Sequence, residues 1–315
     1  MFKFKILILI ILLISCNLFA TKYAGEIFRM GAGVRNFALG GCGVSDFESF
    51  GLAYWNSAFL HKVTEDKFEL MHAEEYMGLL TYDMISAIWG KNNKMSIVIT
   101  RIGIDNIPLT KLENPDEPVS FQNRPYKYKS VNNSDFVIYF GISRKLGNYY
   151  LGFTPKFAYR NLAEENGFGF GADISSYYEF SDKWLIAVKI RDFFTTQILW
   201  GNGTHEIVNP GFDLESNYRF MMPIFNRNSK IFLGTEMYTE GRDTAATTSL
   251  GFLSIDYHVG LELNIHSNVD LYFGYNINNL TSGLSINIKK WKINYSFEQN
   301  SELENSHRIS IGLVL

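Results

Sequence analysis

The sequence predicts an all-β fold: a transmembrane antiparallel β-barrel of about 14 strands, preceded by a short N-terminal plug that contains helix. Three observations support this prediction. Apolar and polar residues alternate with a period of two through most of the chain beyond residue 66. Short polar turns between these segments alternate with longer connectors. The composition combines 16% aromatic residues with only 19% charged ones, below the usual quarter of a soluble domain.

The first 20 residues, MFKFKILILIILLISCNLFA, have the form of a secretory signal peptide. Lys3 and Lys5 precede an apolar core that is too short for the ~20 residues of a membrane-spanning helix. We favour cleavage after Ala20, because a spanning barrel needs no lipid anchor. Cleavage before Cys16, with lipidation of that cysteine, is the alternative. Residues 1–20 hold two lysines and no acid, so cleavage after residue 20 brings the formal charge of −3 to about −5.

Residues 21–65 lack the two-residue period and are expected to form the plug. Ser49–Leu60 can form a short helix, and Gly40-Gly41-Cys42-Gly43 requires a permissive backbone. A compact segment without strands, placed ahead of a barrel, is most simply enclosed in the barrel lumen. We interpret Cys42, the cysteine left after cleavage at residue 20, as a small buried residue.

Three charged residues of this segment, Arg29, Arg35 and Asp46, would then lie inside the barrel. Because buried charges need partners, we expect them to pair with one another or with acidic residues of the lumen. This favours a structural latch over a catalytic role.

Residues 66–315 are expected to form the barrel. In the segment 149–160, for example, Tyr149, Leu151 and Phe153 alternate with Gly152 and Thr154. Fifteen candidate strands follow from such alternation: 66–75, 80–89, 94–104, 134–143, 149–160, 167–180, 184–191, 212–220, 230–238, 246–256, 259–266, 269–277, 282–289, 291–299 and 305–315. Single-chain barrels have even strand numbers. The boundary at Asp256-Tyr257-His258 is the weakest, so we expect one bent strand there and about 14 in total.

The connectors and the strand ends agree with a barrel. Longer connectors are expected at 105–133, 192–211 and 239–245. Aromatic residues occur near strand ends, where barrels carry interfacial girdles: Tyr149, Tyr159, Phe180, Trp184 and Trp291. The chain finishes on a strand, HRISIGLVL, although Leu315 stands where outer-membrane proteins prefer an aromatic residue. A secreted soluble β-sandwich is the alternative, and its apolar faces would point inward.

The N-terminal segment also carries a specific pattern: Phe28, Gly31, Gly33, Arg35, Ala38, Gly40, Gly41, Val44 and Asp46, followed by Tyr54-Trp55-Asn56-Ser57-Ala58-Phe59-Leu60. In order and spacing it resembles the PorV/PorQ family of outer-membrane proteins, which is itself similar to the FadL-like barrels. Ser57 replaces the usual proline, and Cys42 stands where alanine is common. The residues expected to matter in the plug are Arg29, Gly31, Gly33, Arg35, Gly40, Gly41, Asp46, Tyr54, Trp55 and Asn56.

The resemblance implies a barrel of 14 strands with an N-terminal plug, in the outer membrane of a two-membraned bacterium. It implies a non-enzymatic component of protein export or surface attachment, as in type IX secretion, with secretion-apparatus proteins and exported proteins as partners. The alternative is a FadL-like channel for hydrophobic small molecules such as fatty acids, for which an apolar pocket between plug and wall is expected. Scattered basic residues give no sign of nucleic-acid binding.

Catalytic, cofactor and metal sites are not expected. His72 and Glu74 share a strand face but offer too few ligands for a metal. His266-Ser267-Asn268 contains the residue types of a lipase site, but adjacent residues in a tight turn are poorly placed for nucleophilic catalysis.

Overall fold

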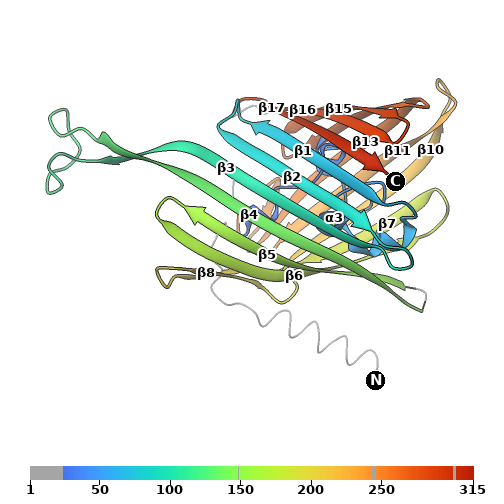
Figure 1. Cartoon of the computed structure of the whole chain (residues 1–315), viewed down its shortest axis with the longest axis horizontal. Coiled ribbons are helices and arrows are strands. Elements are labelled where there is room, and N and C mark those ends of the chain that lie inside the picture. The colour runs from blue at the N-terminus through green and yellow to red at the C-terminus, as the bar shows by residue number, and fades with distance from the viewer. Residues whose placement is uncertain (1–23, 148, 243–245, 301–302) are drawn as a thin grey trace.

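The computed structural model describes residues 24–147, 149–242, 246–300 and 303–315, so the predicted signal peptide lies outside the described residues. The chain is a closed barrel of 14 antiparallel strands (Figure 1). Consecutive strands pair around the wall, and β1 closes the ring by pairing with β17. The predicted fold class, a FadL-like transmembrane barrel, is confirmed.

The wall consists of β1 (Lys67–Glu75), β2 (Leu80–Trp89), β3 (Met95–Lys111), β4 (Tyr126–Leu146), β5 (Tyr149–Leu162), β6 (Glu165–Glu179), β7 (Trp184–Arg191), β10 (Gly211–Met222), β11 (Arg227–Tyr238), β13 (Leu253–His266), β14 (Val269–Asn276), β15 (Asn279–Ile288), β16 (Trp291–Gln299) and β17 (Ser306–Val314). Short turns gather at the end of the barrel where β1 begins. The longer connectors lie at the opposite end, which we call the loop end.

The two-residue alternation places apolar side chains on the outside of the wall. On β5, Phe153 and Phe157 are 40% and 56% exposed, whereas Thr154 and Lys156 point inward and are 3% and 1% exposed. The predicted strand-end aromatics, Tyr149, Tyr159, Phe180, Trp184 and Trp291, are likewise exposed. An apolar exterior around a polar interior suits a lipid environment and is the reverse of a soluble sandwich. Among the described residues, no helix is long and apolar enough to cross a membrane.

The predicted strand boundary at Asp256-Tyr257-His258 was indeed false. Residues 253–266 form the single strand β13, and only the short β12 (Thr248–Leu250) pairs beside it.

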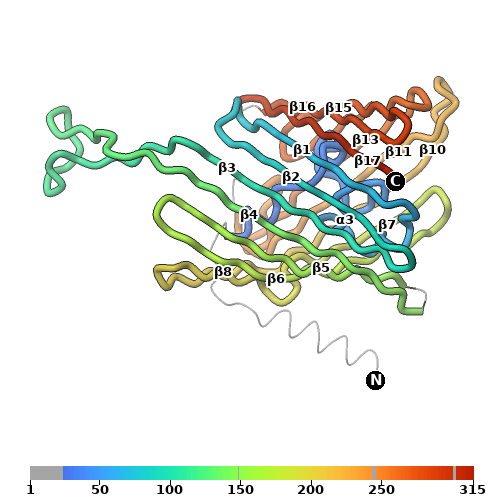
Figure 2. Tube along the Cα trace, viewed as in Figure 1, coloured from blue at the N-terminus to red at the C-terminus, as the bar shows by residue number. Residues whose placement is uncertain are grey.

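Two predicted connectors turned out to contain strands. β3 and β4 extend far beyond their wall neighbours as a two-stranded ribbon (Figures 1 and 2). The region 192–211 contains β8 (Thr196–Trp200) and β9 (His205–Val208), which pair with each other, and β8 pairs with β6. Asp192 and Thr195 adopt φ angles of 53° and 70°, so the backbone breaks the two-residue period between β7 and β8.

The described part of the predicted plug, residues 24–65, is largely buried and lies inside the wall (Figure 2). We use the word plug for these residues. It contains four short helical elements: η1 (Glu26–Phe28), α2 (Val34–Ala38), α3 (Leu52–Trp55) and η2 (Ser57–Lys62). The single helix expected over Ser49–Leu60 is therefore wrong. Asn56 separates α3 from η2, because its backbone is extended, with φ −158° and ψ 95°.

Candidate functional site

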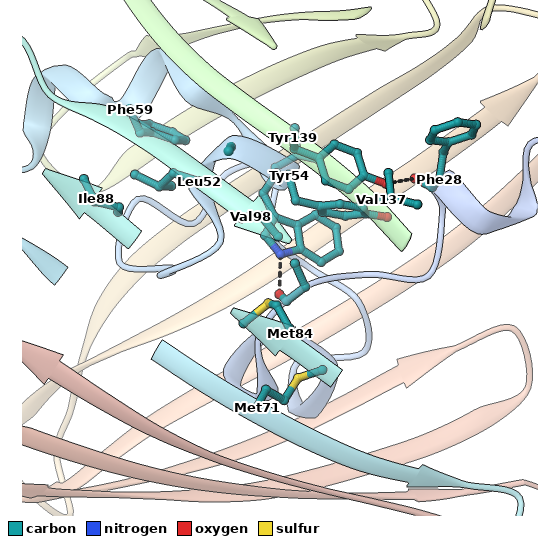
Figure 3. Close-up of a cluster of buried hydrophobic side chains, with 14 of the residues drawn as sticks. Phe28, Leu52, Tyr54, Phe59, Met71, Met84, Ile88, Val98, Val137 and Tyr139 are labelled. Atoms are coloured by element: carbon teal, nitrogen blue, oxygen red, sulfur yellow. Dashed lines mark hydrogen bonds between the residues drawn. The ribbon is translucent and has the colours of Figure 1, made fainter. Parts of the chain in front are cut away.

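The interface between plug and lumen wall is the candidate functional site, and one half of it is apolar. α3 packs against β3 and β4, and η2 packs against β3, β4, β5 and β6. The same apolar cluster includes the buried wall residues Tyr82, Met84, Val98, Val137 and Tyr139. Figure 3 labels Met84, Val98, Val137 and Tyr139 together with Leu52, Tyr54 and Phe59 of the plug. Alternation predicted strands with one apolar and one polar face. On β2–β4 the inner face instead combines buried apolar side chains with buried polar ones: Ser86, Ser96, Thr100 and Asp135.

Within this apolar half, Tyr54 and Trp55 bind the rest of the plug. The Tyr54 ring lies edge-on to Tyr139 of β4 with ring centres 5.2 Å apart (Figure 3). Its hydroxyl accepts a hydrogen bond from the Gly31 amide at 3.0 Å. Trp55 Nε1 donates to the carbonyl of Ala32 at 2.7 Å. These two bonds connect α3 to the chain segment that precedes α2.

Asn56 and Ser57 fix the turn that follows. Asn56 Nδ2 donates to the Val44 carbonyl at 2.8 Å, and its Oδ1 accepts from the Ala58 amide at 3.1 Å as the N-cap of η2. Ser57 Oγ lies 2.6 Å from Thr154 Oγ1 on β5. Ser57 therefore links the plug directly to the wall.

The three predicted charged residues, Arg29, Arg35 and Asp46, lie in two separate ion-paired groups. Arg35 Nε lies 2.7 Å from Asp46 Oδ2, and its Nη2 lies 2.7 Å from Glu262 Oε2 on β13. Burial alone would raise the pKa of Asp46, but the adjacent Arg35 charge outweighs burial and holds this pKa below its usual range. Arg29 is apart from this group and pairs with Glu240 near the loop end at 3.0 Å.

Glycines of the predicted pattern let the plug backbone approach the wall. Gly31, Gly33, Gly40 and Gly41 all have positive φ angles, from 69° to 90°. A Cβ at Gly40 would lie 2.7 Å from the backbone nitrogen of Tyr275 on β14. Only glycine permits this approach, since the neighbouring atoms are backbone and cannot move aside.

The other half of the lumen is charged. Lys156 Nζ lies 2.7 Å from Asp173 Oδ1, and Lys189 Nζ lies 3.0 Å from Asp173 Oδ2. Arg191 Nε lies 2.5 Å from Asp213 Oδ2. All five side chains are buried. These charges of opposite sign compensate one another inside the barrel.

The sequence did not identify the partner of the glycine-rich turn. The carboxylate of Glu215 on β10 accepts hydrogen bonds from the amides of Gly43, Val44 and Ser45 at 2.9–3.1 Å. Successive amides that converge on one carboxylate form an anion-binding nest. The inward face of 212–220 and the glycine run were each visible in the sequence. Their pairing across about 170 positions was not.

Two cavities differ in character. A lumenal cavity of about 140 Å³ is lined by polar side chains that include Arg29, Glu236, Arg242 and His258. An apolar groove of about 300 Å³ lies on the outer face of β7, β10, β11 and β13. The channel alternative predicted an apolar pocket between plug and wall. This lumenal cavity has polar lining and is not that pocket. With the plug in this position, passage along the apolar half of the lumen requires the plug to move.

The two other candidate groups have ordinary structural roles. His72 Nδ1 lies 2.6 Å from Asp83 Oδ1 on the exposed surface. His266, Ser267 and Asn268 form the turn between β13 and β14, where Ser267 Oγ donates to Asn268 Oδ1 at 2.7 Å.

Proteins of the same fold are found among solved structures. The toluene transporter TbuX of Ralstonia pickettii covers 90% of this chain and 97% of its own, with a TM-score of 0.56 and 9% identity. The toluene transporter TodX of Pseudomonas putida covers 90% and 96%, with a TM-score of 0.55 and 10% identity. The monoaromatic hydrocarbon channel CymD gives a TM-score of 0.53 at 10% identity over 90% and 96%. These likenesses establish the fold.

No protein-family model matches the chain. No curated protein sequence matches it either.

Proposed function

We propose that the chain is a non-enzymatic, FadL-like channel of the bacterial outer membrane that passes small hydrophobic molecules when its plug shifts. The observation that carries the proposal is the division of the lumen into an apolar and a charged half. It is supported by the fold shared with the toluene transporters TbuX and TodX over 90% of the chain.

The apolar half provides the path. Displacement of α3 and η2 would uncover side chains on the inner faces of β3 and β4, including Val98 and Val137, which the plug buries. These side chains would line a route on which an apolar molecule stays out of water. The charged half offers no such surface, because an apolar solute there would meet the buried charges of Lys156, Asp173, Lys189 and Arg191.

Locking the plug tests this mechanism. Ser57 Oγ and Thr154 Oγ1 lie 2.6 Å apart, so a Ser57→Cys/Thr154→Cys double variant can form a disulfide between η2 and β5. Cells of a two-membraned host that express the chain would be assayed for uptake of labelled toluene and labelled oleate. We expect oxidation to stop uptake and a reductant to restore it. Each single-cysteine variant is a control that should be insensitive to oxidation.

Uptake that is unchanged by the disulfide, once its formation is verified, would contradict the proposed plug movement. Uptake that is equal in cells with and without the chain would contradict the channel itself.

A second function, PorV/PorQ-like attachment or export of proteins, is favoured by the ribbon of β3 and β4. Pairing of β3 with β2 ends at Gly103, and pairing of β4 with β5 ends at Asn133. Beyond these residues the ribbon projects from the loop end, and we call residues 105–132 the arm (Figure 1).

The tip of the arm is held by hydrogen bonds and exposes an aromatic side chain. Asn123 donates to the carbonyls of Asn114 and Glu117 at 2.9 and 3.0 Å, which fixes the loop. Phe121 is 84% exposed on this fixed loop, and the guanidinium of Arg124 lies 4.2 Å from its ring centre. Exposed aromatic side chains on an ordered loop are typical of protein-binding surfaces.

Shortening the arm tests the second function. Residues 105–132 would be replaced by a two-residue turn, which leaves all pairing with β2 and β5 intact. Exported proteins that share a C-terminal domain should then no longer co-purify with the barrel, whereas Phe121→Tyr should retain them. Unchanged co-purification, or a source genome without type IX machinery, would contradict this function and leave the channel proposal unaffected.

A further inference from the structure

Three chemically reactive side chains from three different elements meet in the lumen. Cys42 of the plug, Glu215 of β10 and His258 of β13 each place a ligand atom within 4.8 Å of the other two. All three residues are buried. The ion pairs that hold the plug, described above, do not involve the thiol or the imidazole.

The barrel register explains why the imidazole reaches Glu215. Gly234 of β11 is the paired neighbour of both Glu215 and His258, so the three positions form one row across the wall. A Cβ at Gly234 would lie 2.1 Å from His258 Nε2. Because this position lacks a side chain, His258 leans across β11 and places Nε2 3.8 Å from Glu215 Oε2.

A second glycine, Gly260, leaves room for the thiol of Cys42. Gly260 lies two residues beyond His258 on β13, and a Cβ there would lie 3.3 Å from Cys42 Sγ. The thiol is fully buried, and burial, followed by the negative charges of Glu215 and Asp46, raises its pKa well above the usual range.

The imidazole of His258 has a free coordination position. His258 is only 4% exposed, and among the described residues its ring makes no hydrogen bond. His258, Gly40 and Gly41 line the lumenal cavity of about 140 Å³, which gives ions and water access to the imidazole.

We propose that Cys42, His258 and Glu215 bind one Zn²⁺ ion, which clamps the plug to β10 and β13. Thiolate, imidazole and carboxylate are the donor types of zinc sites, and a water from the cavity would complete the tetrahedron. Binding exchanges the S–H bond for an S–Zn bond and releases one proton to the cavity. Glu215 Oε2 accepts from two amides, Gly43 and Val44, and coordination replaces one of these bonds.

The site is tested on the purified full chain, folded in detergent and stripped with a chelator. Co²⁺ serves as the spectroscopic probe and Zn²⁺ as the competitor. We expect one Co²⁺ per chain, a thiolate-to-cobalt charge-transfer band, and loss of that band when Zn²⁺ is added. Cys42→Ser should abolish the band, and His258→Gln should weaken Zn²⁺ binding at least ~10-fold.

Matched controls separate the site from other ligands. His61→Gln should leave the band and the affinity unchanged. Gly234→Ala keeps all three ligands but crowds His258, so it should also weaken binding. Folding of each variant is checked by heat-dependent gel mobility. If Cys42→Ser does not fold, the Zn²⁺ affinity of His258→Gln decides the test. Absence of the band in the unaltered chain, its persistence in Cys42→Ser, or unchanged affinity in His258→Gln would overturn the proposal.

Discussion

Arg35 of the plug and Glu262 of the wall are 227 positions apart in the chain, yet Nη2 of the arginine lies 2.7 Å from Oε2 of the glutamate. Arg35 also pairs with Asp46 within the plug, and all three side chains are buried. One guanidinium thus neutralises two carboxylates, one from the plug and one from the wall. The plug depends on this contact, because removal of the arginine leaves the buried carboxylate of Asp46 without its ion-pair partner, whereas Glu262 keeps Lys230 at 3.2 Å.

Replacement of Arg35 should accordingly be costly. We expect Arg35→Met to lower the free energy of unfolding by about 3–5 kcal/mol, the usual cost of an uncompensated buried ion pair. Equilibrium unfolding in urea measures this change. Lys62→Met is the matched control, since Lys62 and Glu179 form an exposed pair with side chains 27% and 43% accessible. The control should cost about 0–1 kcal/mol. Equal effects of the two variants would contradict the latch.

The same contact predicts how plug docking depends on pH. The folded-state pKa of Asp46 is lowered, so its contribution is present above the ordinary value of about 3.9 and is lost as the pH falls below it. Hydrogen exchange of plug amides should therefore be flat between about pH 5 and 8, once corrected for intrinsic rates, and rise only in stronger acid. Asp46→Asn should remove this acid dependence. A loosening of the plug near neutral pH would be incompatible with an ionised Asp46.

The close approach of plug and wall at Gly40 gives a third prediction. Gly40→Ala places a Cβ 2.7 Å from the Tyr275 nitrogen, whereas Gly78→Ala meets nothing within 4 Å. The φ angles are 69° and 80°, so both variants carry the same left-handed strain of about 1–2 kcal/mol. We expect Gly40→Ala to lose a further ~1–3 kcal/mol from overpacking. Thermal melting of the two variants side by side measures the difference, and identical melting temperatures would contradict direct backbone contact.

Sequence periodicity was sufficient to predict the barrel wall but not the packing of the plug inside it. Alternation along a strand fixes which side chains share a face, so Phe153 and Lys156 could be assigned to opposite sides. It does not report what covers a face. The buried apolar side chains on the inner faces of β2–β4, such as Met84, Val98 and Val137, were missed for this reason.

The wall residues that contact the plug could not be predicted from the sequence, for a different reason. The charges of Arg35 and Asp46 and the glycine run were visible, but Glu262, Glu215 and His258 reach them only through the ring closure of the barrel. The arm was also missed, because the two-residue period lapses there. The register of β3 against β4 shifts between Ile104 and Ile107, and Asn106 adopts a φ of 59°.

Trp55 tests whether the YWN segment anchors the plug. It is 3% exposed and its indole nitrogen donates to Ala32. We expect Trp55→Ala to lower the free energy of unfolding by about 3–5 kcal/mol, through the loss of buried aromatic area and the cavity left behind. Trp291→Ala removes the same side chain from the lipid-facing surface, where it is 48% exposed, and should cost less. Both are measured by urea unfolding.

The combined variant is more demanding. Tyr54, Trp55 and Asn56 hold α3 to the wall, to the segment before α2 and to the start of η2, respectively. Replacing all three with alanine should therefore free the plug while the hydrogen-bonded wall remains closed. Limited proteolysis would then cleave residues 24–65 and leave the barrel intact, because the fourteen-strand ring closes through β1 and β17 without the plug. A plug as protease-resistant in this variant as in the unaltered chain would show that the segment is not its anchor.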